Sequence, residues 1–415
     1  MRVLVLFFWI SAISLAYVAT APAYLLAADG VDCSIASSAI GVASSIRGLS
    51  ILRTVPCKLQ SRAEVEKYLR QTLHKKVPAE RVQREGVIYR LLGLIPMDYD
   101  YVNGVVKLYT DQIGGYYDPE KEYYAMAAWI PAVMQMPIAV HELTHALQDQ
   151  HFNLDHLVDD EKEFSDTLMA RAALIEGDAT AVMIDYSRKM TGQPPISQDE
   201  SVTSVMMQNI SGAMISSSLT QAPASLQAMI IFPYVSGLNF VHVLLKKGGY
   251  KGIDEAFKGI PNTTAEILHP ASYASSKRDF KELDVPKPPV EVKLSKAEPV
   301  FIDRLGEFVI STLLGSWLPP REASQAAAGW AADKLALYET KDSPGSLIVW
   351  DLLWETPEDA ADFLQAISKA YEKRFAVESV KKSPEEVLFS KTEIGAVSIT
   401  KNDRNTRVLI GLPAA

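Results

Sequence analysis

PIAVHELTHALQDQ, residues 137–150, contains an HExxH motif formed by His141, Glu142 and His145. The motif lies within a run from Tyr123 to Gln148 in which Glu142 is the only formally charged side chain. A lone ionised carboxylate in an apolar helix is costly unless a cation pairs with it, so this context favours a bound cation over a solvated helix surface.

The spacing of the motif predicts a zinc site. A helix that begins at Pro137 and continues to about Gln150 carries His141 and His145 on one face, because residues four apart share a face. Both imidazoles can then bind one zinc ion, while Glu142 projects beside them as a general base. The other interpretation is an amphipathic helix with incidental histidines. It is weakened because four of the seven histidines lie between His141 and His156.

A catalytic zinc ion takes three protein ligands, so a third ligand is needed. The best candidate is Glu176 in LIEGDA, residues 174–179, on a helix predicted from about Asp166 to Met190. The face that Glu176 shares is small or apolar and consists of Ala172, Ala173, Ala179, Thr180 and Met183. Gly177 weakens the helix and is best explained if another backbone or the motif helix approaches it closely.

Other ligands remain open at this point. The alternatives to Glu176 lie closer to the motif in sequence and are Asp149, His151, Asp155 and His156. Asp178 points about 200° around the helix from Glu176, so it is not expected to be a ligand. It is expected to pair with Arg171, whose other candidate partner is Asp185, or to accept a hydrogen bond behind the ligands.

Composition limits the class of protein. The chain has 415 residues, 48% hydrophobic and 22% charged, which is typical of a globular protein with more than one domain. Its formal net charge of −9, with no basic run, argues against a nucleic-acid partner and against binding to an anionic membrane surface.

The N-terminus predicts export. Arg2 is followed by an uncharged apolar run to Ala28, which is typical of a signal peptide over residues 1–28. The alternative is an uncleaved anchor, which would be the only membrane attachment. Either way we expect a periplasmic, cell-envelope or secreted protein.

The two cysteines, Cys33 and Cys57, lie in the segment 29–60. They are expected to form a disulfide in an oxidising compartment, the alternative being two free thiols.

The predicted fold class is α+β, with a mainly helical region at residues 61–284. Helices are expected to start at Ser61 and Pro78, and a tyrosine-rich β-hairpin is expected at residues 114–124. Residues 202–247 are apolar but rich in serine and asparagine, which favours core helices over a membrane span.

A Pro- and Lys-rich linker is predicted at residues 285–299, followed by a C-terminal α+β domain at residues 300–415. In that domain Trp330, Trp350 and Trp354 are expected in the core. The sequence predicts helices at 305–318 and 357–375, strands at 334–339 and 346–352, and a terminal hairpin from strands 396–400 and 406–412.

The motif and its surroundings resemble a known group of enzymes. HELTHALQDQHF at 141–152, followed by LIEGDA, is similar to the gluzincin group of zinc metallopeptidases, and in particular to poorly characterised bacterial exported proteins of that type. The similarity extends to four further segments, at residues 114–119, 232–237, 264–270 and 329–333.

The resemblance implies a zincin-like fold and hydrolysis of peptide bonds in a peptide or protein substrate, by an endopeptidase rather than an exopeptidase. Water bound to zinc would be deprotonated by Glu142 and would attack the carbonyl. In such enzymes a strand aligns the substrate by β-pairing, and the hairpin at 116–124 is the candidate here. The side chains that could stabilise the transition state or support the ligands are Tyr234, His269, Tyr273, Asp178 and Thr180.

Two other functions remain open from the sequence. The protein could be a non-catalytic binding or assembly module of the cell envelope in which zinc is structural or occluded. It could also be a zinc hydrolase that acts on a non-peptide amide.

Overall fold

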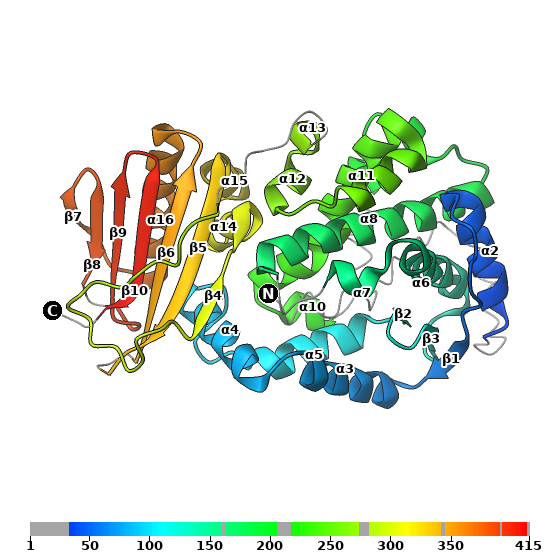
Figure 1. Cartoon of the computed structure of the whole chain (residues 1–415), viewed down its shortest axis with the longest axis horizontal. Coiled ribbons are helices and arrows are strands. Elements are labelled where there is room, and N and C mark those ends of the chain that lie inside the picture. Colours follow the sequence, from blue (N-terminus) through cyan, green and yellow to red (C-terminus); the bar gives the residue numbers. More distant parts are fainter. Residues whose placement is uncertain are drawn as a thin grey trace.

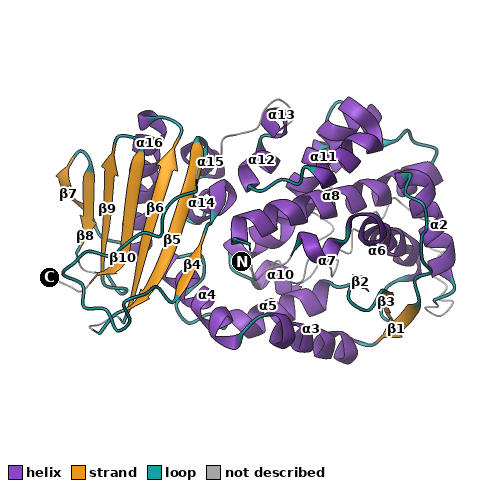
Figure 2. Ribbon diagram, viewed as in Figure 1, coloured by secondary structure: helices purple, strands orange, loops and turns teal. Residues whose placement is uncertain are grey.

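The computed structural model describes residues 33–158, 163–205, 217–273, 282–341, 345–390 and 392–412. The predicted signal segment, residues 1–28, lies outside these described residues. The chain folds into a helical part that carries a small three-stranded sheet and a C-terminal part built on a seven-stranded sheet (Figures 1 and 2). The predicted α+β class is therefore confirmed.

The helical part contains most of the helices. They are α2 (Ile35–Arg47), α3 (Arg62–Lys76), α4 (Ala79–Leu92), α5 (Tyr101–Gln112), α6 (Ala132–Phe152), α7 (Leu154–Leu157), α8 (Ser165–Met190), α10 (Ser217–Gln221), α11 (Ala224–Lys258), α12 (Thr264–Leu268) and α13 (Pro270–Tyr273), with a 3₁₀ turn at Ile196–Gln198. Helix α8 runs through the middle of this part and packs on α2, α6, α11 and α12 (Figure 1).

Local capping explains the helix starts that the sequence predicted. Ser61 caps α3 through a capping box, in which its hydroxyl accepts the Glu64 N–H and the Glu64 carboxylate accepts the Ser61 N–H. Pro78 occupies the N-cap of α4. The motif helix α6 differs from the prediction. It begins at Ala132, so Pro137 lies inside it rather than at its start.

Helix α11 covers α8 and is kinked at Gly249, whose φ of 62° lies in the left-handed region. By length and composition this helix could cross a membrane, but 67% of its most apolar window is buried within the protein. This burial is that of a core helix and agrees with the prediction for residues 202–247, of which 206–216 lie outside the described residues.

The small sheet has the strand order β1-β3-β2. Strands β2 (Gly115–Asp118) and β3 (Tyr123–Ala127) form the predicted antiparallel hairpin, with Tyr117 opposite Tyr124. Strand β1 (Cys57–Gln60) pairs with β3 in parallel. Strand β2 is thus an edge strand, and its outer side faces helix α6.

A disulfide joins Cys33 to Cys57, as the sequence predicted. Cys33 lies two residues before α2, and Cys57 begins β1, so the bond fixes α2 beside the small sheet. Helix α2 also packs directly on α6 and α8. Residues 33–60, the described part of the segment that the sequence set apart, therefore share the packing of the helical region.

Removal of this disulfide should destabilise the protein. For a bridge between residues 24 positions apart, Cys33→Ala/Cys57→Ala should lower the free energy of unfolding by about 3 kcal/mol, because the unfolded chain gains conformational freedom. Urea denaturation measures this change. Reductant should have the same effect on the wild-type protein and none on the double variant. Equal stability of the two proteins would contradict the prediction.

The C-terminal sheet has the order β4-β5-β6-β10-β9-β8-β7, with all neighbours antiparallel. Its strands are β4 (Phe301–Asp303), β5 (Trp330–Glu339), β6 (Ser346–Trp354), β7 (Val380–Ser383), β8 (Glu386–Phe389), β9 (Ala396–Asn402) and β10 (Asn405–Leu412). Strands β5, β6 and the hairpin β9–β10 were predicted, with β5 starting four residues earlier than expected.

Alternation along the strands separates the two faces of this sheet. Ile348, Trp350 and Leu352 of β6 belong to the main core, on the face that α14 (Gly306–Gly315) and α16 (Pro357–Phe375) cover. Helix α15 (Pro320–Ala327) packs on both of these helices. Helix α16 has the predicted bounds, whereas α14 is shorter than predicted. Trp330, Trp350 and Trp354 are all buried, which confirms their assignment to the core.

The opposite face is partly covered by the predicted linker. Val292 and Leu294 pack against a small cluster that includes Leu347 and Val349, and Leu294 forms a single β-bridge with Thr340. The segment 285–299 is otherwise free of helix and strand, as predicted, but it is held against the sheet.

The two parts share one continuous hydrophobic core, which includes side chains from Val65 to Ile410. Polar contacts join them as well. Arg304, just after β4, lies with its Nε 3.2 Å from the carboxylate of Asp166 at the start of α8. The helix that carries Glu176 is therefore fixed at its N-terminal end by the C-terminal part.

Candidate metal centre

Helix α6 brings His141 and His145 onto one face, as the spacing predicted. Their rings lie at 84° to one another, with centroids 4.8 Å apart and Nε2 atoms 3.1 Å apart. The early start of α6 does not disturb this arrangement. Pro131 caps the helix, and Pro137 removes only the hydrogen bond that its own N–H would have made, in the second turn.

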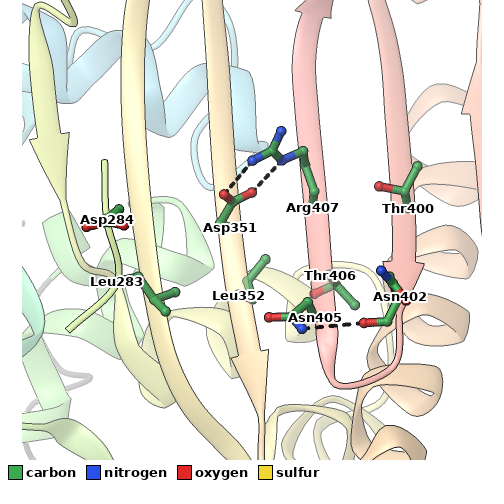
Figure 3. Close-up of a pocket in the computed structure, with 9 residues that line it drawn as sticks. All are labelled: Leu283, Asp284, Asp351, Leu352, Thr400, Asn402, Asn405, Thr406 and Arg407. Atoms are coloured by element: carbon green, nitrogen blue, oxygen red, sulfur yellow. Dashed lines mark hydrogen bonds and ion pairs between the residues drawn. The ribbon is translucent and has the colours of Figure 1, made fainter. Parts of the chain in front are cut away.

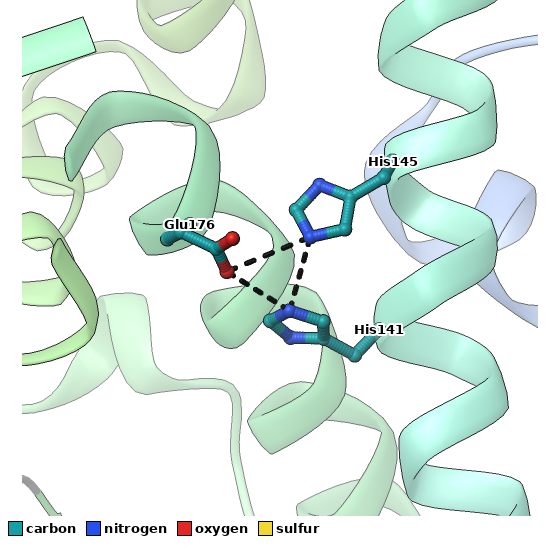
Figure 4. A group of neighbouring side chains, drawn as sticks. All are labelled: His141, His145 and Glu176. Atoms are coloured by element: carbon teal, nitrogen blue, oxygen red, sulfur yellow. Dashed lines mark hydrogen bonds and ion pairs between the residues drawn. The ribbon is translucent and has the colours of Figure 1, made fainter. Parts of the chain in front are cut away.

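Helix α8 supplies Glu176, which completes the predicted group (Figure 4). Its Oε2 lies 3.1 Å from Nε2 of His141 and 3.5 Å from Nε2 of His145. The three ligand atoms lie within 4.8 Å of one another. The structure thus gathers the three residues that were predicted to bind zinc.

Helix α8 lies close to α11 beside Glu176. A Cβ on Gly177 would lie 2.3 Å from the backbone oxygen of Gly237, and a Cβ on Gly237 would lie 2.1 Å from that of Ala173. Backbone therefore touches backbone where the two helices cross. This confirms the reason predicted for Gly177, with α11 as the neighbour.

The group is deeply buried, and its charges are coupled. His145 and Glu176 are 0% exposed and His141 is 3% exposed. Burial alone would lower the pKa of His145, but the charge and hydrogen bond of Glu176 raise it to about 9. Burial would likewise raise the pKa of Glu176, but His145 and His141 together hold it below its usual value. His145 therefore supplies positive charge to this carboxylate, whereas burial lowers the pKa of His141.

The edge strand β2 positions Glu142, the predicted general base. The Tyr117 N–H donates a hydrogen bond to Glu142 Oε2 at 3.1 Å, and Glu142 is 0% exposed. The Tyr117 hydroxyl in turn donates to Asp149 at 2.9 Å, one turn beyond His145 on α6. The tyrosine-rich hairpin is thus bound to the motif helix at two points. Its pairing with a substrate remains a prediction.

Behind the ligands lies a second layer of polar side chains. Gln148 Oε1 is 2.8 Å from Nδ1 of His145, and Gln148 Nε2 donates to Asp178 at 2.9 Å. Asp178 also accepts a hydrogen bond from Arg47 of α2. It is therefore an acceptor behind the ligands, which was one of its two predicted roles.

The other predicted role of Asp178, a pair with Arg171, is wrong. Arg171 binds Glu163 at 2.9 Å and the backbone oxygen of Leu157 at 2.8 Å. Asp185 does not pair with Arg171 either, and instead accepts a hydrogen bond from the Ile196 N–H. Arg171 also donates to the Asn262 side chain at 3.1 Å, so its guanidinium is bound away from Asp178.

The alternative third ligands have other partners. Asp149 accepts hydrogen bonds from Tyr117 and the Leu154 N–H, and His151 binds the backbone oxygen of Ser50. Asp155 is paired with Lys76. Neither these residues nor His156 belong to the group of described residues that could hold a metal ion, and Glu176 does.

The candidate transition-state residues divide between two places. The Tyr234 ring lies beside His141, with centroids 6.3 Å apart and planes at 29°, so α11 brings it to the centre. Thr180 is buried one turn after Glu176. The other two candidates are held elsewhere. His269 binds Glu307 of α14 at 2.8 Å, and the Tyr273 hydroxyl donates to Gly259.

Sequence reasoning missed several side chains at the centre. The structure adds Arg47, Gln148, Tyr109 and Tyr124. Burial raises the pKa values of Tyr109 and Tyr124 well above the usual range, and the charges of Glu176 and Glu142 respectively raise them further. Protonated phenols therefore accompany both carboxylates. Gln148 lies three residues after His145 in the motif helix, so helical spacing alone could have indicated it.

A pocket of about 460 Å³ lies far along the chain from these residues, on the outer face of the C-terminal sheet (Figure 3). It is lined by residues of β6, β9 and β10 and by Leu283 and Asp284. Its guanidinium group, Arg407, is already bound to Asp351 through two hydrogen bonds. None of its lining residues belongs to the metal group.

Comparison with known protein families identifies the C-terminal part of the chain. Residues 298–415 match the model of a family described as "Domain of unknown function (DUF8575)". This match covers the C-terminal sheet and its helices and leaves His141, His145 and Glu176 outside. No curated protein and no solved structure matches the chain.

Proposed function

We propose that this protein is an exported zinc metallopeptidase in which His141, His145 and Glu176 bind one zinc ion and Glu142 acts as the general base. The observation that carries this proposal is the convergence of three ligand atoms from α6 and α8 within 4.8 Å of one another. Each of the three residues has the chemistry of a catalytic zinc ligand.

The donor set fits zinc better than other common cations. Two imidazole nitrogens and one carboxylate suit zinc, whereas calcium and magnesium prefer oxygen ligands. The second carboxylate oxygen of Glu176, Oε1, is buried and has no hydrogen-bond partner in the described part of the chain. A buried acceptor left in this way is costly, and a cation between the two Nε2 atoms and Glu176 would satisfy it.

Zinc bound here would act as a Lewis acid towards water and a peptide carbonyl. Glu142 would take the proton of the attacking water, and the Tyr117 N–H would hold its carboxylate in position. Tyr234, beside His141, is the candidate donor to the developing oxyanion. The substrate would be a peptide or protein, cleaved internally.

The disulfide supports the proposed location. Structural disulfides persist in oxidising compartments, so the Cys33–Cys57 bond fits a periplasmic, cell-envelope or secreted protein. The uncharged segment before Ala28 supports the same location, and an uncleaved form of it would be the only attachment to a membrane.

One observation favours the alternative function, a non-catalytic envelope module with an occluded zinc ion. Glu142, His145 and Glu176 are fully buried, and Glu142 is bound by the edge strand against which a substrate would pair. Hydrolysis therefore requires β2 or a neighbouring segment to move. An assay of casein cleavage by the zinc-loaded protein separates the two functions.

The proposal predicts about one zinc ion per chain after purification without chelator. Glu176→Ala should lower the zinc content strongly, because the two histidines alone leave the site one ligand short. Asp155→Ala is the matched control, since Asp155 is an exposed carboxylate paired with Lys76 and should leave zinc content unchanged. Elemental analysis measures both. A wild-type protein without zinc would refute the proposal.

A further inference from the structure

Arg47 is a buried cation at the last residue of α2. Its Nε lies 2.8 Å from the carboxylate of Asp178, and its Nη2 lies 2.8 Å from Asp254 of α11. The guanidinium also lies over the Tyr250 ring, 5.1 Å from its centroid. Burial alone would lower the pKa of Arg47, but Asp178 and Asp254 together raise it, so it remains charged.

Gln148 connects this ion pair to the metal group, and the direction of its amide is fixed. Its Nε2 lies 2.9 Å from Asp178 Oδ2 and 3.1 Å from the backbone oxygen of Ile175. The backbone oxygen of Ile175 is an acceptor. Asp178 must also accept, because Arg47 can only donate to it. The amino end of the amide must face them, and the carbonyl oxygen must face His145.

This direction determines which nitrogen of His145 carries the proton. Gln148 Oε1 lies 2.8 Å from Nδ1 of His145 and can only accept, so Nδ1 must be the donor. In the neutral ring Nε2 is then left with its lone pair, directed towards Glu176 and His141. A metal ion needs this tautomer at its ligand.

We propose that Arg47 is a positioning residue of the metal centre, which acts through Asp178 and Gln148 to fix the ring and tautomer of His145. This inference rests on the proposed function. It makes helix α2 a component of the site through Arg47. The Cys33–Cys57 disulfide holds that helix in place on the side away from Arg47.

Two substitutions test the proposal. Arg47→Met removes the charge but keeps an apolar chain, whereas Gln148→Met breaks the connection and leaves the Arg47–Asp178 pair in place. Each should weaken zinc binding about 10- to 100-fold, which is the usual effect of a lost outer partner of a ligand. The double variant Arg47→Met/Gln148→Met should bind zinc about as weakly as the single variant with the lower zinc affinity. Both changes interrupt the same series of contacts, so their effects should not add.

Arg304→Met is the matched control. Arg304 is buried, like Arg47, and pairs with Asp166 on the same helix, α8. Asp166 lies about 15 Å along that helix from Glu176. Arg304→Met should therefore destabilise the fold, as Arg47→Met does, and should keep the zinc affinity of the wild type.

The readouts are the zinc dissociation constant, from competition with a chromophoric chelator, and the melting temperature of each metal-free variant. Equal loss of affinity in Arg47→Met and Arg304→Met would overturn the proposal, since it would reflect general destabilisation. Wild-type affinity in Gln148→Met would overturn it too, and this variant decides if Arg47→Met does not fold. A wild-type protein that binds no zinc would refute the proposed function itself.

Discussion

Glu142→Gln should lower peptide hydrolysis about 10³-fold while the zinc content stays unchanged. The amide has nearly the shape of the carboxylate, and its oxygen can still accept the Tyr117 N–H, so the hairpin and the helix should remain in place. It cannot take a proton at neutral pH. The loss of a general base lowers the rate by about 10³-fold, so kcat/KM should fall by that factor. The measurements are casein cleavage and zinc content on the same samples.

Asp149→Asn is the matched control for this substitution. Asp149 lies on the same helix and is also bound to Tyr117, but it reaches neither the ligands nor Glu142. Its replacement should leave hydrolysis largely intact. Activity that survives Glu142→Gln would exclude the proposed mechanism. A zinc-loaded wild-type protein without activity towards casein and short peptides would instead favour the non-catalytic module.

The elements that the sequence predicted well are those with strong local signals. Ser61 and Thr356 cap helices through their own neighbours, and helix α16 begins and ends where the pattern indicated. Helix α6 differed because a proline inside the second turn loses only one hydrogen bond, and a second proline at 131 could start the helix earlier. Local rules could not choose between two prolines six residues apart.

The metal ligands were predictable because HExxH spacing and the small face around Glu176 are encoded within single helices. The contacts behind them were not. Angular position on one helix offered Arg171 as a possible partner of Asp178, but the cation that binds Asp178 is Arg47, 131 residues earlier in the chain. Packing of α2 against α8 decides this choice, and no local pattern records it.

A signal for Arg47 was nevertheless present. From Cys33 to Leu52 it is the only charged residue, just as Glu142 is the only one from Tyr123 to Gln148. A lone charge in an apolar segment requires a buried partner wherever that segment packs in the core. The same reasoning applied to both segments would have indicated that Arg47 is buried and ion-paired, although not with which carboxylate.

Gly177→Ala should lower the free energy of unfolding by about 3 kcal/mol or more, because the added Cβ would meet the Gly237 backbone at 2.3 Å and must push α8 away from α11. Helix propensity alone predicts the opposite, an increase of about 1 kcal/mol in the free energy of unfolding. Gly41→Ala is the control that isolates propensity, since Gly41 lies exposed within α2 and a Cβ there would meet nothing within 4 Å.

Urea denaturation of the two glycine variants, with and without zinc, measures both effects. Gly41→Ala should be as stable as the wild type or more so. Because Glu176 directly precedes Gly177, displacement of α8 should also weaken zinc binding, so zinc should stabilise Gly177→Ala less than it stabilises the wild type. Wild-type stability in Gly177→Ala would show that the two helices do not touch at this point, and the position of Glu176 would then need another explanation.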